Sequence, residues 1–517
     1  MSIEMPPAPS TRPGAEGTLA SFLSELLLEQ QRLQTPVARF AALHEHGLAS
    51  PATRPLIPLT APSPGEQYAF EVDLDACSGC KACVSACHSL NGLDENEAWR
   101  DVGLIHGGTT AAPYQQTITT ACHHCTDPAC LNGCPVVAYE KDPITGIVRH
   151  LDDQCIGCSY CILKCPYDVP KYNERLGIVR KCDMCQQRLA VGEAPACAQA
   201  CPTHAISIIK VITSSANTDF LSAAPAPHYT RPTTAYITKR EIPANVTAAD
   251  ANTLYVQHAH APLVAMLTLT QLAVGLLTTA TLFPLPSELT RLSFSMSFIR
   301  SFVTYYVTNF SDHIAQLGGL GLLFAGLSAS VLHLGQPTRA WRFFLGLRTS
   351  WLSREILVFS IFAPLALETF ALPESGILRA SVVIIGFVGV ACSAMIYIDT
   401  RRRFWAPLPT SIRFLGTAII AALLPIQPPA AITLLLIKLS FEIYQSVGAS
   451  NSARILRGPL RPALALRFFL AAASIATLIA GQSLAAFALF AAGELVERVL
   501  FFKAVDSPKM PGHPVSP

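Results

Sequence analysis

Residues 155–166 read CIGCSYCILKCP, and this stretch decides the fold of the region around it. Its four cysteines are separated by two, two and three residues, and a proline follows the last of them. Three similar groups occur elsewhere between Cys77 and Cys201. Sixteen of the seventeen cysteines thus lie in four groups of four. The groups are Cys77, Cys80, Cys83 and Cys87; Cys122, Cys125, Cys130 and Cys134; Cys155, Cys158, Cys161 and Cys165; and Cys182, Cys185, Cys197 and Cys201.

The spacing within 155–166 is the ligand run of two-cluster bacterial ferredoxins, in which the fourth cysteine ligates the other cluster. The first group has this spacing without the proline, whereas the second and fourth groups have longer inner loops. Paired C-x-x-C units also form tetrahedral zinc sites. A zinc site rarely uses three cysteines at two-residue spacing before a fourth. The pattern therefore favours four [4Fe–4S] clusters over zinc.

The composition divides the chain between water and lipid. Of its 517 residues, 51% are hydrophobic and 14% are charged, whereas soluble domains carry about 25% charged residues. A chain of this length is expected to form at least two domains. The net charge of +2 gives no electrostatic argument for binding nucleic acid. We expect no export signal, because residues 1–17 have neither an apolar core nor a twin-arginine pair.

The cysteine groups define the soluble part of the chain. Residues 1–66 are expected to form an N-terminal extension, with an amphipathic helix within 18–43 and then a proline-rich linker. Alternating apolar residues predict short strands beside the cysteine loops, at 68–74, 147–151 and 205–209. We therefore expect an α+β double ferredoxin-like [4Fe–4S] domain over 67–210. Residues 211–257, rich in Ser, Thr, Ala and Pro, are expected to be a linker, which could in part wrap on the domain.

Beyond the linker, the sequence is strongly apolar. We expect 258–505 to form an all-α polytopic membrane bundle of eight helices, and 506–517 to be a disordered tail. Each run has about the 20 residues needed to cross a bilayer. The runs are 262–283, 314–334, 355–373, 380–398, 412–427, 429–446, 464–482 and 484–503. Cys392, the seventeenth cysteine, lies in the fourth run and is interpreted as a small buried hydrophobe.

The cysteine region resembles the four-cluster iron–sulfur subunit of molybdenum oxidoreductases of the dimethyl sulfoxide reductase type. The resemblance rests on ACHHCTDPACLNGCP, DDQCIGCSYCILKCPYDVPKYN and KCDMCQQRLAVGEAPACAQACPTHAI, and it covers about 68–210. It implies that groups one and four share two clusters, and that groups two and three share the other two. The implied ligand sets are Cys77, Cys80, Cys83 and Cys201; Cys87, Cys182, Cys185 and Cys197; Cys122, Cys125, Cys130 and Cys165; and Cys134, Cys155, Cys158 and Cys161. The resemblance further implies that the third of these sets lies nearest the membrane.

The apolar half resembles the eight-helix membrane anchor of the same enzyme family. The matching stretches are HAPLVAMLTLTQLAVG at 260–275, SVLHLGQPTRAWRFFLGLRTSWLSREI at 330–356, IYIDTRRRFW at 396–405 and GELVERVLFF at 493–502. The resemblance implies an anchor that binds quinol and carries no haem. His333 is the only histidine within the eight runs, and histidine can exchange a proton near neutral pH. We therefore expect His333 at a quinone site, with Gln271 and Arg339 as further candidates, and weaker ones at Arg354, Glu355, Glu494 and Arg498. Glu494 and Arg498, four residues apart, could equally form a structural pair.

The arginines between the apolar runs alternate in number from one connection to the next. With eight crossings, the cysteine region shares its side with the arginine-rich connections, which predicts that it faces the cytoplasm. The arginine-rich connections hold Arg339, Arg342, Arg348 and Arg354; Arg401, Arg402, Arg403 and Arg413; and Arg454, Arg457, Arg461 and Arg467. The opposite connections hold Arg291, Arg300 and Arg379. We therefore expect a multi-pass protein of the bacterial inner membrane.

The sequence thus predicts a fused electron-transfer and anchor subunit with no catalytic residue of its own. The resemblance implies that a separate molybdopterin subunit exchanges electrons with the quinone pool through the clusters. Two kinds of partner reaction stay open: sulfite oxidation with quinone reduction, and reduction of an S- or N-oxide with quinol oxidation. One alternative is a zinc-bearing membrane scaffold or regulator without redox function. Another is a redox-driven ion-translocating module, which the scarcity of acidic and lysine residues within the runs disfavours.

Overall fold

The computed structural model describes residues 25–26, 28–29, 55–95, 97–215, 220–282, 310–372 and 375–512. The chain divides into two units, Met1–Pro55 and Leu56–Pro517. In the first unit, residues 25–26 and 28–29 are helical. The rest of the helix expected within 18–43 lies outside the described residues. All further features belong to the second unit.

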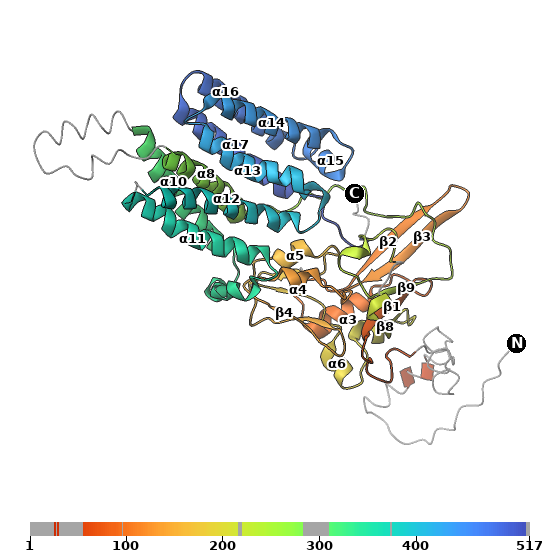
Figure 1. Ribbon diagram of the computed structural model, residues 1–517. Coiled ribbons are helices and arrows are strands. Elements are labelled where there is room, and N and C mark those ends of the chain that lie inside the picture. The colour runs from red at the N-terminus through yellow and green to blue at the C-terminus, as the bar shows by residue number, and fades with distance from the viewer. Residues whose placement is uncertain are drawn as a thin grey trace, which may run out of the picture. The chain divides into compact units, whose positions relative to one another are not determined.

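Small sheets and short helices build the cysteine-rich region (Figure 1). One sheet has the strand order β8–β1–β9 and another β10–β2–β3, while β4–β5 and β6–β7 form hairpins. The strands are β1 Glu66–Asp73, β2 Asp101–Gly108, β3 Pro113–Thr120, β4 Tyr139–Lys141, β5 Val148–His150, β6 Lys171–Asn173, β7 Ile178–Arg180, β8 Ile206–Ile212, β9 Ala235–Ile237 and β10 Thr247–Ala248. The helices are α3 Ala82–Asn91, α4 Ala129–Gly133, α5 Tyr160–Lys164, α6 Gln186–Ala190 and α7 Ala196–Gln199.

The three strands predicted beside the cysteine loops are confirmed as β1, β5 and β8. β1 and β8 pair antiparallel from Glu66 opposite Ile212 to Val72 opposite Ile206, so the first and last strands of the predicted domain close on each other. Phe70 and Val72 of β1 are buried, as their alternation with polar residues predicts. The result is the α+β framework expected from the sequence.

Residues 220–257 are part of this framework rather than a simple connection. β9 adds to β1 in parallel, and β10 adds to β2 antiparallel. Two short 3₁₀ helices accompany them, η1 Thr213–Ser215 and η2 Pro227–Tyr229. Thr234 contacts His123 beside the second cysteine group, with 2.8 Å between Oγ1 and Nδ1. The segment expected to be a linker thus covers the cysteine loops.

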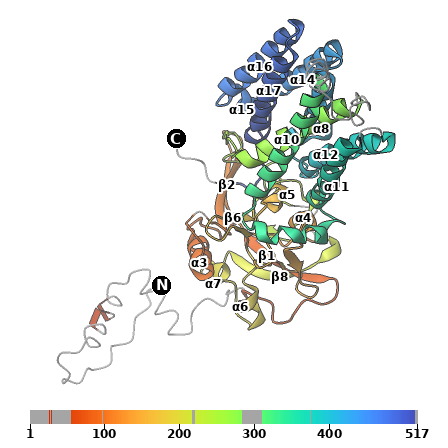
Figure 2. The ribbon, with the colours of Figure 1, turned by 90° about the vertical axis from the view of Figure 1, so that its left-hand side faces the viewer.

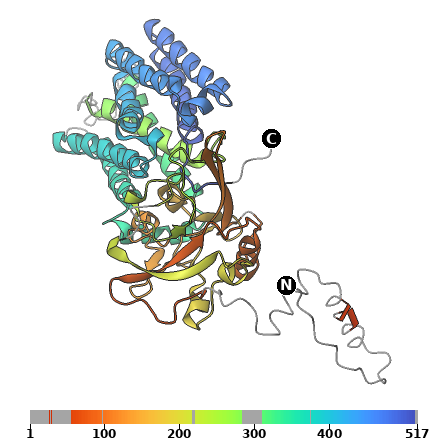
Figure 3. The ribbon, with the colours of Figure 1, turned by 90° about the vertical axis from the view of Figure 1, so that its right-hand side faces the viewer.

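The second half of the unit is helical, and Figures 2 and 3 show its long helices gathered at one end of the unit. Each of the eight apolar runs is occupied by a long helix. These are α8 Ala261–Leu282, α10 Phe310–Leu332, α11 Trp351–Ala371, α12 Gly376–Ile398, α13 Pro407–Leu423, α14 Pro428–Val447, α16 Arg461–Ile479 and α17 Ser483–Lys503. Shorter helices lie between them: η4 Pro337–Gly346, η5 Arg403–Trp405 and α15 Asn451–Arg457.

Not all of these helices qualify as membrane spans by length and apolar composition. Within the described part of the chain five do, namely α8, α10, α12, α14 and α16. A sixth is reached if η4 and α11, bent by 105°, count as one span. α13 is shorter, at 17 residues, and α17 carries Glu494, Glu497 and Arg498. The chain is a multi-pass membrane protein with five or six such candidates.

The end of the chain packs on the cysteine-rich region. The Lys509 ammonium lies 2.6 Å from a carboxylate oxygen of Asp250, and the amide of Gly512 donates to the same side chain at 3.3 Å. Met510 is buried. The prediction of a disordered tail over 506–517 is therefore wrong for residues 506–512, because a buried carboxylate just before α8 holds them.

Candidate electron-transfer site

The first C-x-x-C loop of each group turns through a residue of positive φ immediately before its second cysteine. In the third group this residue is Gly157, and an added Cβ would collide with the backbone of Gly177 and Gly335. Glycine is the residue that takes this conformation without steric cost. The four turning residues are Gly79, His124, Gly157 and Met184, with φ between 40° and 74°.

The three Cys-Pro turns also share one backbone form. The third residue after each of these cysteines has a φ of 51–54°, namely Val137, Asp168 and His204. This turn directs the next amide at the cysteine sulfur. The amide of Ala138 donates to Cys134 Sγ at 3.2 Å, and that of Ala205 donates to Cys201 Sγ at 3.3 Å. Hydrogen bonds of this kind adjust the reduction potential of a cluster.

The fold brings the cysteines together in four sets. Set one lines one pocket and set three lines another. In sets two and four, the thiols lie near enough for the charge on one to act on the next. Set one is Cys77, Cys80, Cys83 and Cys201, and set two is Cys87, Cys182, Cys185 and Cys197. Set three is Cys122, Cys125, Cys130 and Cys165, and set four is Cys134, Cys155, Cys158 and Cys161.

Several of the clustered thiols are buried donors whose ionisation needs a bound metal. Burial and the neighbouring Cys197 thiol raise the pKa of Cys87 to about 12, and burial raises the pKa of Cys165 to about 11. Such thiols are thiolates at neutral pH only where a metal takes the place of the proton. The sets thus fit [4Fe–4S] clusters.

Set four lies against the helical half, through the segment that follows His333. The Gln336 amide donates to the carbonyl of Ile156 at 3.0 Å, and the Gly346 amide donates to that of Pro135 at 2.9 Å. Cys158 packs against the apolar core of the helical half. The expectation that set three lies nearest the membrane is therefore wrong, because the contacts after His333 fall on residues that flank Cys155 and Cys134.

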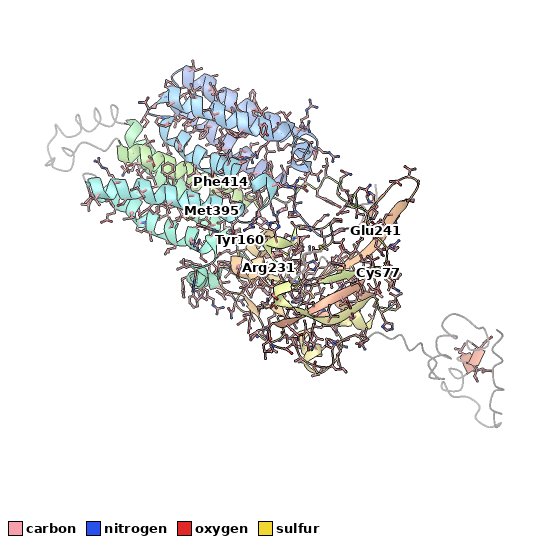
Figure 4. The ribbon with its side chains drawn as sticks, turned by 45° about the vertical axis from the view of Figure 1, so that its right-hand side comes forward. Cys77, Tyr160, Arg231, Glu241, Met395 and Phe414 are labelled. Carbon is pink, nitrogen blue, oxygen red and sulfur yellow. The ribbon has the colours of Figure 1, made fainter. Side chains whose placement is uncertain are left out.

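The short helix α5, between Cys158 and Cys165, forms a second contact with the helical half. The Tyr160 hydroxyl donates to the carbonyl of Ile396 at 3.1 Å, and Figure 4 shows Tyr160 at this junction beside Met395 of α12. Lys164 pairs with Asp399 at 2.6 Å and is almost fully buried. Arg402 donates to the carbonyl of Leu163 at 3.2 Å. α5 is thus held by the connection between α12 and α13.

The three residues expected at a quinone site do not lie together. His333 follows the last residue of α10 and is partly buried, and its Nδ1 has no hydrogen-bond partner among the described residues. Arg339 instead donates to the carbonyls of Asp152 and Cys155, at 2.9 and 3.2 Å. It therefore holds the cysteine-rich region to η4.

Gln271 belongs to a different polar site, deep in the helical half. Its Oε1 accepts a hydrogen bond from Arg498 Nη2 at 2.7 Å. The weaker candidate Glu355 is buried and contacts Ser393 on α12. Arg354 stacks over Trp351 at 4.4 Å and caps the carbonyls of Leu347 and Arg348.

A buried network of charges joins α8, α13, α14, α16 and α17. Glu494 contacts Lys438 and lies 2.8 Å from Arg467, which also binds Glu442 at 2.9 Å. Each network side chain is at most 6% exposed. A charge that is buried to this degree is strongly unfavourable unless it is paired with an opposite charge. The members are Gln271, Arg413, Lys438, Glu442, Arg467, Glu494, Glu497 and Arg498.

This network corrects two expectations from the sequence and confirms part of a third. Charged residues are not scarce within the helices. Glu494 takes part in structural pairing between helices, as one of its two expected roles, but its partners lie on α14 and α16 and not at Arg498. Arg413 and Arg467, counted above with the membrane-face arginines, lie inside α13 and α16 and are buried. The sequence signal that could have found the network is the presence of Lys438 and Glu442 in one apolar run, four residues apart.

Comparison with known proteins matches both halves of the molecule. Residues 114–211 match the family described as 4Fe-4S dicluster domain, and residues 258–428 match the family described as DMSO reductase anchor subunit (DmsC). The B subunit of the anaerobic dimethyl sulfoxide reductase of Escherichia coli K12 is 35% identical over 177 residues, which cover 32% of this chain and 86% of that protein.

Two further relatives match over the cysteine-rich region. Hydrogenase-2 operon protein HybA of Escherichia coli O157:H7 is 37% identical over 160 residues, 26% of this chain and 49% of that protein. The formate dehydrogenase-O iron-sulfur subunit of Escherichia coli K12 is 34% identical over 158 residues, 27% of this chain and 52% of that protein. With its sixteen clustered cysteines and its apolar helices, the chain therefore belongs to the dimethyl sulfoxide reductase-type family, as a fusion of a 4Fe-4S dicluster domain like that of the B subunit with a DmsC-type membrane anchor.

Proposed function

We propose that this chain carries electrons between a separate molybdopterin catalytic subunit and the membrane quinone pool. Each of the four cysteine sets would hold one [4Fe–4S] cluster. The observation that carries the proposal is that set four contacts the helical half, directly beside the segment that follows His333. A cluster placed there can exchange electrons with a quinone at the membrane surface.

The order of the sets supports a single path for electrons. α3 carries Cys83 of set one and Cys87 of set two, one helical turn apart. Lys181, next to Cys182 of set two, lies 3.7 Å from Cys122 Sγ of set three. Cys130 of set three lies on α4, and Cys134 of set four is the C-cap of that helix. Likewise, Cys161 of set four lies on α5, and Cys165 of set three is its C-cap. The sets thus follow one another from one to four.

The outer end of this path is set one. Cys80 is exposed, and Figure 4 shows Cys77 far from the helices. An exposed thiol at the outer cluster suits contact with a partner, and the B subunit of Escherichia coli is named as part of an anaerobic dimethyl sulfoxide reductase. The partner would carry the molybdopterin and the substrate. Both sulfite oxidation and S- or N-oxide reduction remain compatible with the path.

Contacts between the two halves support eight membrane crossings. η4 before α11, Asp399 before α13, and α15 before α16 all touch the cysteine-rich region or its covering segment. The tail after α17 also binds Asp250. Every second connection thus lies on one side, which requires an even number of crossings. The side of each connection supports eight spans, an even number, with α13 and α17 included beside the five or six helices that qualify by length and composition.

The sidedness of the cysteine-rich region follows from the arginines that remain exposed. Arg348, Arg401, Arg403, Arg454, Arg457 and Arg461 are exposed on its side of the helices. Five further arginines on this side are not free to act as exposed charges. Arg413 and Arg467 are buried, and Arg339, Arg342 and Arg402 donate hydrogen bonds to backbone carbonyls of the cysteine-rich region. The positive-inside rule still favours a cytoplasmic cysteine-rich region.

The test is a His333→Ala variant of the purified protein. Its clusters are reduced with dithionite, and their reoxidation by a soluble quinone is followed by visible absorption. We expect wild-type iron content and greatly slowed reoxidation, because the proton-exchanging side chain is lost. His106→Ala, at an exposed position on β2, serves as the control. Reoxidation at the wild-type rate in His333→Ala would disprove a quinone site at His333.

A further inference from the structure

Three histidines gather where α8 begins and α10 ends. His258 and His260 come directly before Ala261, the first residue of α8. His333 comes directly after Leu332, the last residue of α10. The two helices run antiparallel and pack together, so these two ends lie on the same side, that of the cysteine-rich region.

Close contacts between the helices give the level of His333 along α8. A Cβ on Gly319 would lie 2.9 Å from Leu277, and a Cβ on Gly326 would lie 2.9 Å from Thr270. Gly326 follows Gly319 by seven residues on α10, and its neighbour Thr270 precedes Leu277 by seven residues on α8. Seven residues further along α10, His333 therefore lies level with residue 263 of α8. Residue 263 is three residues from His260, which is about 5 Å of helix rise.

The backbone fixes His260 at this level. Its carbonyl accepts hydrogen bonds from the amides of Leu263 and Val264, both at 3.0 Å, so it is part of the first turn of α8. Its ring stands edge-to-face with that of His258, with 4.7 Å between the ring centroids. Both side chains are exposed to solvent.

His333 is the inner member of this group. Its Nδ1 is buried and has no hydrogen-bond partner among the described residues, while the backbone of Ser330 lies near the ring. Burial, and then the charge of His260, lower the pKa of His333 to about 4. The ring is therefore neutral near pH 7.

The other charged groups near this end of the helices are occupied. Arg339 and Arg342 of η4 donate to carbonyls at residues 152–155. Glu355 of α11 contacts Ser393. Among the described residues, the titratable group acting on His333 is His260, and the one acting on His260 is His258.

We propose that His258 and His260 pass protons between water on the side of the cysteine-rich region and the quinone site at His333. The inference rests on the proposed quinone function. Reduction of one quinone takes two electrons from the cluster of set four, one at a time, and two protons through His260 and His333, and yields one quinol. Oxidation of quinol runs the same steps in reverse and releases two protons to the same side.

The test compares His258→Asn/His260→Asn with the wild-type protein in the quinone reoxidation assay between about pH 6 and pH 9. Positioned proton transfer contributes a factor of about 10² or more, so we expect at least a tenfold slower rate, falling further as the pH rises. Added imidazole should restore part of the rate, which a purely structural role of the histidines would not allow. His106→Asn is the matched control, and iron content verifies that the variant has folded.

The outcomes separate this inference from the quinone proposal. If His333→Ala slows reoxidation and the double variant keeps the wild-type rate and pH profile, the relay is disproved and the quinone site stands. If His333→Ala has no effect, the quinone site and the relay both fail. If the double variant loses iron, His260→Gln alone is measured, and a wild-type rate with that variant overturns the relay.

Discussion

Cys158 is the residue that most directly tests the path of electrons into the membrane. It is the thiol of set four that packs against the helical core. We expect Cys158→Ala to lose or convert one cluster of four, so that iron content falls by up to about a quarter. Reoxidation by quinone should slow strongly, while dithionite still reduces the other clusters. Iron analysis and electron paramagnetic resonance measure both effects.

Cys392→Ala is the matched control for Cys158→Ala. Cys392 is a buried cysteine that lies inside α12, away from the four sets. We expect wild-type iron content and a wild-type rate. Loss of iron in Cys392→Ala would mean that the seventeenth cysteine is a ligand and that the division into four sets is wrong.

The sequence predicts single residues well only where their function depends on near neighbours in the chain. Each cysteine loop is local, so spacing alone predicts the four groups, whereas the joining of distant groups, such as Cys77 with Cys201, comes from the resemblance. Arg339 and Gln271 are different, because their partners lie at Cys155 and Arg498, more than 180 residues away. No local pattern indicates such partners. The same holds for Tyr160 and Ile396 at the junction.

At the scale of elements, the buried network holds five helices together and should be sensitive to an unpaired charge. Lys438→Met leaves Glu494 with Arg467 and Thr417 but removes its ammonium partner. Breaking one partner of a buried pair costs about 3–5 kcal/mol. We expect a clearly lower unfolding temperature in detergent, measured by intrinsic fluorescence, with the iron content unchanged.

A second variant separates pairing from packing in this network. Lys438→Met/Glu494→Gln removes both charges, and a neutral pair is often tolerated where a lone buried charge is not. We expect the double variant to recover most of the lost stability. If both variants are equally destabilised, the loss comes from packing around α14 rather than from the lost ion pair between Lys438 and Glu494.

α5 is the element that joins the cysteine-rich region to the helices, so its ion pair should govern that junction. Asp399→Asn keeps the shape of the side chain but removes the charge paired with Lys164. Hydrogen bonds to charged groups contribute about 1.5–3 kcal/mol. We expect faster proteolytic cleavage between the two halves and slower reoxidation of the clusters by quinone. Glu140→Gln, which breaks an exposed ion pair with Arg149 on the β4–β5 hairpin, should change neither.

For the whole molecule, the sequence predicts the order of the parts better than their connection. The eight apolar runs, the strands beside the cysteine loops and the α+β class all correspond to structure. Residues 211–257 and 506–517 are expected to be a linker and a disordered tail, because their composition is polar and aperiodic. Residues 220–257 and 506–512 are instead held in place by β9, β10 and Asp250, through contacts with distant strands and side chains. Composition reports local preference and does not reveal such contacts.

The placement of the tail leads to a prediction about the membrane topology of the whole molecule. Gly458, between α15 and α16, and the tail at residue 512 lie on the side of the cysteine-rich region, whereas Gly481, between α16 and α17, lies on the other side. Alkaline phosphatase fused to a membrane protein is active only outside the cytoplasm. We expect activity for a fusion after Gly481 and none for fusions after Gly458 or Gly512, since the exposed arginines place the cysteine-rich region inside. Activity in the reverse pattern would put the clusters outside and keep eight crossings. Activity that differs between the fusions after Gly458 and Gly512 would contradict the even number of crossings itself.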